Sequence, residues 1–155
     1  VGRLLHKTAA RLLVLRLALV TDCTVTADYE PLYLRGVEHF NRRHFFVSHE
    51  VWEELWLEHQ GPSKLYYKGL IQAAVALFHF ENGNFHGARK LAEGAHRYLE
   101  PYGPKHLGLD IEGFFRAFDA FLAPVWTSEP GRTARVSDQP PPQIHLQPPA
   151  DAATE

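Results

Sequence analysis

The sequence predicts a single all-α domain, a small bundle of five helices around one buried central helix. Two observations predict it: apolar residues recur at helical spacing through residues 29–123, and no stretch of that region reads as a strand. A length of 155 residues suits one domain, and a hydrophobic content of 45% is ordinary for a globular protein. We expect an N-terminal extension and linker over residues 1–28, the bundle over 29–123, and a disordered Pro-rich tail over 124–155.

Capping residues, glycines and prolines set the expected helix boundaries. Pro31 suits the first turn of a helix, where its missing N–H costs nothing, and Pro62 ends the second helix. Gly83 can adopt the left-handed conformation that ends a helix, while Asn84 and Asp110 can cap the helices that follow them. The expected helices span residues 30–42, 45–59, 66–81, 85–99 and 110–123, and the segment 101–109 is expected to be a loop.

The stretch 66–81 is apolar on nearly all sides, which indicates a helix buried on all sides at the centre of the bundle. It is too short to span a bilayer, which requires about 20 apolar residues. Gln72 and His79 interrupt it, and their spacing of seven places both on one helical face. These two polar side chains need partners from neighbouring helices.

Charge and cysteine content exclude several classes of protein. The net charge is −2, so neither nucleic acid nor an anionic membrane is an expected partner. Cys23 is the single cysteine, which excludes a disulfide framework and a cysteine-rich zinc site. A lone thiol without a convincing export signal suggests a reducing, cytoplasmic setting.

Residues 1–21 form a basic segment without acidic residues. Arg3, Lys7, Arg11 and Arg16 supply its charge, and Arg16 interrupts the apolar run from Leu12 to Val20. The interruption argues against a signal peptide, and the run is too short for a membrane span. We expect an accessory extension outside the core, with a transit peptide as the alternative.

The segment 45–56 is the most informative stretch of the chain. Phe46, His49, Glu53 and Trp56 fall on one helical face, so the pattern places an imidazole and a carboxylate within an aromatic stripe. A buried carboxylate is costly unless it is paired, so we expect a buried polar cluster here. Its expected members are His49, Glu50, Glu53, Trp56, Gln72 and His79, with Asn41, Trp52 and Asn84 in support.

Several interpretations of this cluster stay open. A buried hydrogen-bond network would need no cofactor, whereas His49, Glu53 and His79 could instead bind a divalent metal or line a small-ligand pocket. A zincin site is disfavoured because Glu53 occupies the position of its second histidine. The hairpin 66–99 could also act as a protein-interaction module, so a protein partner or a homo-oligomer stays open. The remaining histidines are expected on the surface or in loops: His6, His44, His59, His86, His96, His106 and His145.

Two ordered blocks resemble a known family. His49-Glu50-Val51-Trp52-Glu53-Glu54-Leu55-Trp56, preceded by Phe40-Asn41, resembles the signature of the domain of unknown function 309 family. Gly69-Leu70-Ile71-Gln72, then His79, then Gly83-Asn84 with Gly87-Ala88, resembles the second block of that family. The resemblance covers about residues 30–123 and implies a small all-α bundle. It implies no activity, because none is established for the family.

Overall fold

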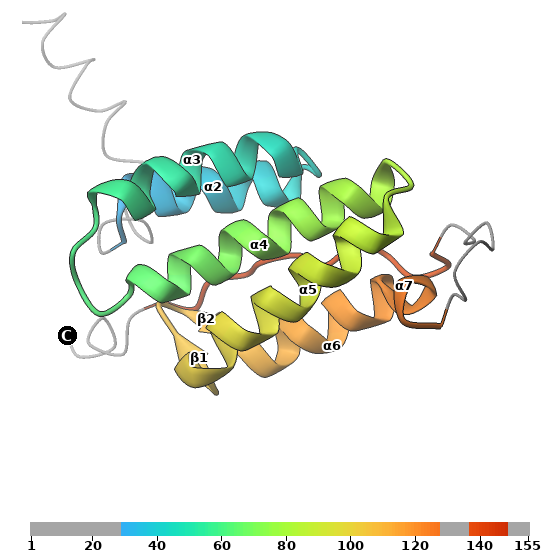
Figure 1. Ribbon diagram of the computed structural model, residues 1–155. Helices are drawn as coiled ribbons and strands as arrows, with labels where there is room; N and C mark the ends of the chain where they lie inside the picture. The colour runs from blue at the N-terminus through green and yellow to red at the C-terminus, as the bar shows by residue number, and fades with distance from the viewer. Residues whose placement is uncertain (1–28, 128–136, 149–155) are drawn as a thin grey trace, which may run out of the picture.

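The computed structural model describes residues 29–127 and 137–148 (Figure 1). The described part contains six α-helices, a 3₁₀ turn η1 (Glu100–Tyr102) and a two-stranded hairpin. The α-helices are α2 (Pro31–Asn41), α3 (Phe45–Glu58), α4 (Lys64–Glu81), α5 (Phe85–Leu99), α6 (Ile111–Phe121) and α7 (Ala123–Thr127). The all-α prediction is confirmed, with α7 as an addition to the five expected helices. The expected N-terminal extension lies outside the described residues.

Helices α2 and α3 pack closely as an antiparallel pair, because Gly36 of α2 leaves room for the buried side chains of α3. A Cβ on Gly36 would lie 1.9 Å from Nε1 of Trp52, so only glycine lets the indole approach this closely. Trp52 Nε1 donates a hydrogen bond to the carbonyl oxygen of Tyr33 at 3.1 Å, and Ser48 Oγ donates to that of Gly36 at 2.8 Å. The inner side of α3 is thereby fixed in register along α2.

Helix α4 lies between the α2–α3 pair and the α5–α6 pair (Figure 1). Leu70, Ala73, Ala74 and Leu77 are fully buried, which confirms its central position. The prediction that α4 is buried on all sides is wrong, however, because α3 and α5 flank α4 without covering it completely. One side of α4 is only partly buried, and its residues are Lys64, Lys68, Ile71, Gln72, Val75, Phe78 and His79.

Local signals set the starts of α5 and α6 as expected. Gly83 has a φ of 77°, and Asn84 Oδ1 accepts a hydrogen bond from the Gly87 amide at 2.9 Å. Asp110 Oδ1 accepts one from the Gly113 amide at 3.0 Å. Each carboxylate or amide oxygen satisfies a backbone N–H that has no partner within its helix.

The expected loop before α6 contains a small hairpin, so the prediction of no strand is wrong here. Strands β1 (Lys105–His106) and β2 (Leu109–Asp110) pair antiparallel, with Lys105 opposite Asp110. Gly108 has a φ of 78°, a backbone conformation that glycine adopts readily, at the turn between them. Ser63 at the start of α4 ties the hairpin down, because its Oγ lies 2.9 Å from His106 Nε2.

Residues 137–148, which we call the C-terminal strap, run along the bundle behind α4 (Figure 1). Ile144 is 1% exposed and belongs to the core. Asn41 Nδ2 donates to the carbonyl oxygen of Ile144 at 2.8 Å, and the Ile144 amide donates to Asn41 Oδ1 at 2.7 Å. The Gln147 amide donates to the carbonyl oxygen of Gly108 at 2.8 Å.

The expected disorder over residues 124–155 is therefore wrong for α7 and for the C-terminal strap. Proline-rich composition indicated too little apolar surface to offset the ordering entropy. One buried isoleucine and a side-chain amide that pairs with its backbone reduce that cost. Residues 128–136 and 149–155 lie outside the described residues. None of the described helices is both long and apolar enough to cross a membrane.

Candidate functional site

The solvent-exposed side of α3 combines apolar and acidic side chains. We call it the α3 outer face, and it comprises Phe46, Val47, Glu50, Glu53, Glu54, Leu57 and Glu58, all exposed. Phe46 lies at its edge and also contacts α4, because its ring centroid is 5.2 Å from that of Phe78. These positions fall within one face of a helix with 3.6 residues per turn. The exposed large hydrophobic residues of the described chain are Phe46 (48%), Val47 (39%), Leu57 (62%) and, in the first turn of α4, Leu65 (51%).

The carboxylates of the α3 outer face have no cationic partner among the described residues. Glu50, Glu53, Glu54 and Glu58 form no ion pair and no side-chain hydrogen bond there. Five carboxylates elsewhere do, since Glu38, Glu81, Glu93, Glu100 and Asp119 each pair with an arginine or a histidine. The α3 outer face is thus a local excess of negative charge next to exposed apolar surface.

The predicted burial of the acidic cluster on α3 is wrong. Glu50 and Glu53 are exposed, and His49 is only half-buried, with its Nδ1 2.5 Å from the carbonyl oxygen of Phe46 in its own turn. Trp56 is half-buried, and its ring lies beneath the ammonium groups of Lys64 and Lys68, 5.3 and 5.7 Å from its centroid. Trp56 Nε1 is buried and has no partner among the described residues.

The structure does not join the predicted residues of α4 to those of α3. Gln72 faces α5, where its Oε1 occupies the space that a Cβ on Gly94 would need. His79 also faces α5, with its Nδ1 3.3 Å from Asn84 Nδ2. No hydrogen bond joins either residue to His49 or Glu53 within the described chain. The supporting residues act elsewhere, because Asn41 holds the C-terminal strap and Trp52 fills the core.

The described residues contain no group of three or more His, Cys, Asp or Glu side chains that could hold a metal ion. His49, Glu53 and His79 therefore do not form the ligand set that a divalent metal would require. His49 and Glu53 do lie one turn apart on α3, as their spacing predicted. The expected third ligand, His79 on α4, instead faces α5.

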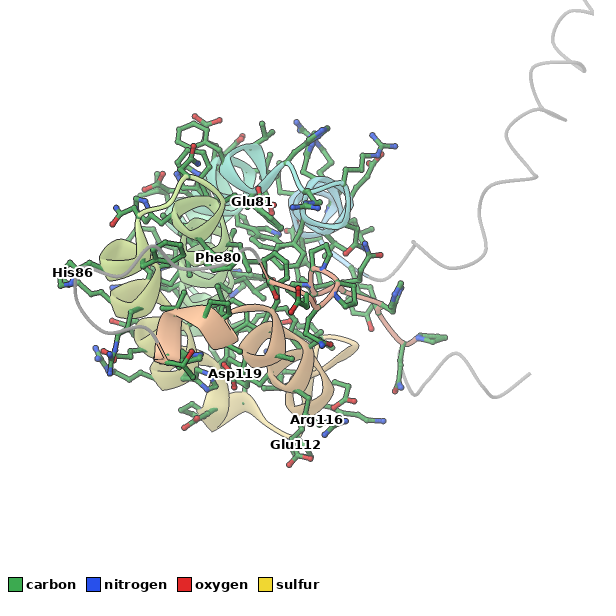
Figure 2. The ribbon with its side chains drawn as sticks, turned by 90° about the vertical axis from the view of Figure 1, so that its right-hand side faces the viewer. Phe80, Glu81, His86, Glu112, Arg116 and Asp119 are labelled. Atoms are coloured by element: carbon green, nitrogen blue, oxygen red, sulfur yellow. The ribbon has the colours of Figure 1, made fainter. Side chains whose placement is uncertain are left out.

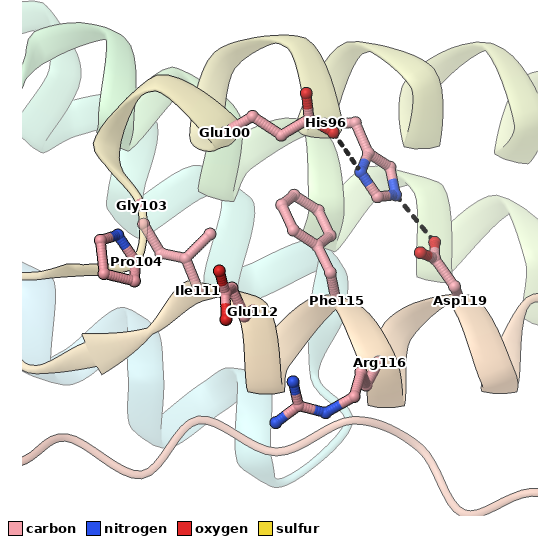
Figure 3. A pocket seen from close by; sticks show the side chains of 9 residues that line it. All are labelled: His96, Glu100, Gly103, Pro104, Ile111, Glu112, Phe115, Arg116 and Asp119. Carbon is pink, nitrogen blue, oxygen red and sulfur yellow. Dashed lines mark hydrogen bonds and ion pairs between the residues drawn. The ribbon is translucent and has the colours of Figure 1, made fainter.

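A hollow of about 590 Å³ lies at the junction of α5 and α6 (Figure 3). His96 lies at its inner side, where its ring stacks on Phe115 with centroids 3.8 Å apart. The His96 Nε2 lies 2.8 Å from Asp119 Oδ1, and its Nδ1 lies 3.1 Å from Glu100 Oε1. The other lining residues are Gly103, Pro104, Ile111, Glu112 and Arg116.

Two carboxylates favour the charged form of His96. The hydrogen bond that His96 donates to the Asp119 carboxylate raises the pKa of His96, partial burial opposes this, and Glu100 raises the pKa further. Both ring nitrogens are engaged, so neither is free to move a proton for a ligand. The group therefore links α5 to α6. Glu112 and Arg116, which point outward at the edge of the molecule in Figure 2, form no ion pair among the described residues.

His96 and His106 were expected on the surface or in loops, but the structure half-buries both side chains. The spacing of four residues between His96 and Glu100 could have indicated the first of its two hydrogen bonds. No local spacing could have indicated the second, because Asp119 lies on a different helix. His106 packs against the rings of Tyr66 and Tyr102, and burial lowers its pKa. Among the described residues, no carboxylate pairs with His106, so the Ser63–His106 pair lacks there the acid that would orient a catalytic histidine.

Comparison with known proteins covers the part of the chain that contains the α3 outer face. Residues 33–91 match the family model described as "Domain of unknown function (DUF309)". The uncharacterized protein YpuF of Bacillus subtilis (strain 168) is 40% identical over 77 residues, which are 48% of this chain and 44% of that protein. The chain thus aligns with less than half of that relative. The family match confirms the resemblance read from the sequence over residues 33–91, which span most of α2, all of α3 and α4, and the first half of α5. The matching family is one of unknown function.

Proposed function

We propose that this domain is a protein-interaction module, and that the α3 outer face binds a partner segment that carries both apolar and basic side chains. One observation carries the proposal: exposed hydrophobic residues and carboxylates without partners lie on the same side of one helix. Exposed apolar side chains gathered in this way are typical of binding surfaces. The proposal concerns this domain and not the activity of a longer protein.

The apolar residues supply the binding energy. Phe46 and Leu57 are eleven residues apart, which is about 16 Å along a helix at 1.5 Å per residue. Apolar surface removed from water contributes about 25 cal/mol per Å². A partner helix of about three turns would cover both anchors, which is the usual way in which an amphipathic helix binds an apolar surface.

The carboxylates select the charge of the partner. Glu50, Glu53, Glu54 and Glu58 lie between and beside the apolar anchors. They repel phosphate groups, so they argue against nucleic acid and for a basic segment. Complementary charge at the rim of an interface raises the association rate and excludes acidic partners.

The inner side of α3 keeps this surface rigid. Trp52 is fully buried against Gly36, and Ser48 Oγ donates to the carbonyl oxygen of Gly36 at 2.8 Å. A rigid surface loses little conformational entropy when a partner binds. A cytoplasmic setting stays part of the proposal and is supported by the single cysteine, Cys23.

Titration with a designed peptide tests the proposal. The peptide is helical, about three turns long, with leucines on one face and lysines beside them, and a matched peptide carries glutamate in place of lysine. We expect binding of the basic peptide and none of the acidic one. Glu50→Gln/Glu53→Gln/Glu54→Gln should weaken binding about tenfold, because each exposed ion pair contributes ~0.2–1 kcal/mol and 1.4 kcal/mol is a factor of ten.

A second variant controls for net charge. Glu38→Gln/Glu93→Gln/Glu112→Gln changes the charge by the same amount but leaves the α3 outer face intact, so affinity should stay within about twofold because separated exposed charges are screened at physiological salt. Equal loss in both variants, or equal binding of both peptides, would contradict the proposal.

A further inference from the structure

We propose that the surface beneath the C-terminal strap is a second binding site, which takes an extended segment of another protein with apolar side chains at alternate positions. The strap occupies this surface when no partner is bound. We call the surface the strap site, and its hydrogen-bonding groups are Asn41 at the end of α2, Gly108 in the turn between β1 and β2, and Tyr29. It includes no residue of the α3 outer face, so the inference does not depend on the proposed function.

The strap site holds the strap through main-chain groups. Asn41 Nδ2 donates to the carbonyl oxygen of Ile144 at 2.8 Å, and the Ile144 amide donates to Asn41 Oδ1 at 2.7 Å. The Gln147 amide donates to the carbonyl oxygen of Gly108 at 2.8 Å, and Tyr29 Oη donates to the carbonyl oxygen of Gln147 at 2.7 Å. Because every residue except proline carries both main-chain groups, these contacts accept segments of different sequence.

The side chains of the strap alternate between the bundle and solvent. Pro142 and Ile144 are buried, and Leu146 is partly buried against the core. The intervening residues, which are exposed, are Gln143, His145 and Gln147. A period of two is the pattern of an extended chain that lies on a surface. Main-chain hydrogen bonds together with apolar side chains at every second position are a common way in which proteins recognise extended peptides.

The groups that receive the strap are fixed by the bundle. Gly108 has a φ of 78°, and a Cβ there would lie 2.6 Å from the carbonyl oxygen of Gln147, so glycine lets the main chain of the strap approach. Asn41 follows Phe40, whose buried ring packs against that of Trp52. A site with fixed donors and acceptors loses little conformational entropy when a segment binds.

The strap covers this surface only in part. A hollow of about 310 Å³ lies beside it, lined by residues of β2, α6 and the strap, and Phe114 is among them. Segments with few buried side chains open at a lower free-energy cost than the whole domain. A partner segment can therefore replace the strap without unfolding the bundle, and its side chains can extend into the hollow.

Displacement of the strap in the full-length chain tests the inference. The probe is an unlabelled synthetic peptide with the sequence of residues 139–148, added in excess to the isotope-labelled protein. We expect the Ile144 amide signal to move to its free-chain position, while the side-chain amide signal of Asn41 stays in place because the peptide restores its hydrogen bonds. A peptide with serine at the three outward positions should act equally, whereas a peptide with aspartate in place of its isoleucine should displace nothing.

Variants of the strap sharpen the test. Ile144→Ala weakens the hold of the strap, so the peptide should bind at least about tenfold more tightly, because apparent affinity rises with the fraction of open sites. Ile144→Val should act in the same direction by less, and it serves if the alanine variant does not fold. Asp138→Asn, an exposed strap residue, is the control and should change affinity by less than about twofold. An unmoved Ile144 signal, equal affinity for Ile144→Ala and the parent chain, or strap exchange between two copies without peptide binding would overturn the inference.

Discussion

The α5–α6 junction and the α3 outer face are built from the same kinds of residue but differ in their pairing. At the junction, His96 bonds Glu100 and Asp119 through both ring nitrogens and stacks on Phe115. On α3, His49 bonds only a carbonyl oxygen of its own turn, and the neighbouring glutamates have no partner among the described residues. The types of residue therefore do not distinguish a structural cluster from a docking surface. The distinction lies in whether the polar side chains have hydrogen-bond or ion-pair partners within the described chain.

The largest expected effect contrasts the two sides of α3. Trp52→Ala should lower the free energy of unfolding by about 3–5 kcal/mol, because it leaves a cavity at a fully buried site. Trp56→Ala should cost less, since this indole is only half-buried at the margin of the core and its other side lies beneath lysines. Chemical denaturation of both variants measures the difference. Equal losses would mean that the outer side of α3 is part of the core.

The C-terminal strap should contribute to the stability of the fold, as the α5–α6 junction does. Ile144→Ala should lower the free energy of unfolding by about 2–5 kcal/mol, the usual range for a buried isoleucine. His145→Ala, an exposed neighbour on the same strap, serves as the control and should have little effect. A negligible loss for Ile144→Ala would show that the strap does not depend on this anchor.

The His96 group should make stability depend on pH. Because its pKa is raised in the folded state, the folded protein binds the proton more tightly, so this stabilisation is complete below about pH 6.5 and is lost as pH rises through the folded pKa. His106 acts in the opposite direction, since its lowered pKa costs stability as pH falls below about 6.5. Denaturation curves between about pH 5 and 8 should lose the His96 contribution in Asp119→Asn. An unchanged pH profile in that variant would contradict the described pairing.

The smallest expected effect lies on the α3 outer face. Glu53→Ala should change the free energy of unfolding by less than about 0.5 kcal/mol, because the carboxylate is exposed and has no described partner. The buried cluster expected from the sequence would instead predict a loss of about 1–3 kcal/mol. Thermal or chemical denaturation separates the two values, and a large loss would restore the buried cluster.

Local signals in the sequence predicted most of the fold. Helical periodicity and the caps Asn84 and Asp110 act within a few residues, so the sequence contains the whole interaction. The C-terminal strap could not be predicted in this way. It depends on Asn41, which lies 103 positions before Ile144.

The candidate site was predicted less well because α3 carries two apolar stripes. Phe46 and Trp56 share a face with His49 and Glu53, and that pattern suggested the interior. The structure buries the other stripe, with Phe45 and Trp52 at 1% and 0% exposure and with Ser48 also buried. The helical periodicity of apolar residues cannot show which of two such stripes is buried, since only contacts with α2 and α4 decide which stripe faces inward.

Mapping where a basic peptide binds is the most direct test of the α3 outer face as a binding surface. The designed lysine–leucine peptide is titrated into the isotope-labelled protein, and amide chemical shifts are followed residue by residue. We predict that the largest shifts fall on Phe46, Val47, Glu50, Glu54 and Leu57, with small shifts around His96. Shifts centred on the α5–α6 junction, or no shifts at all, would contradict binding at the α3 outer face.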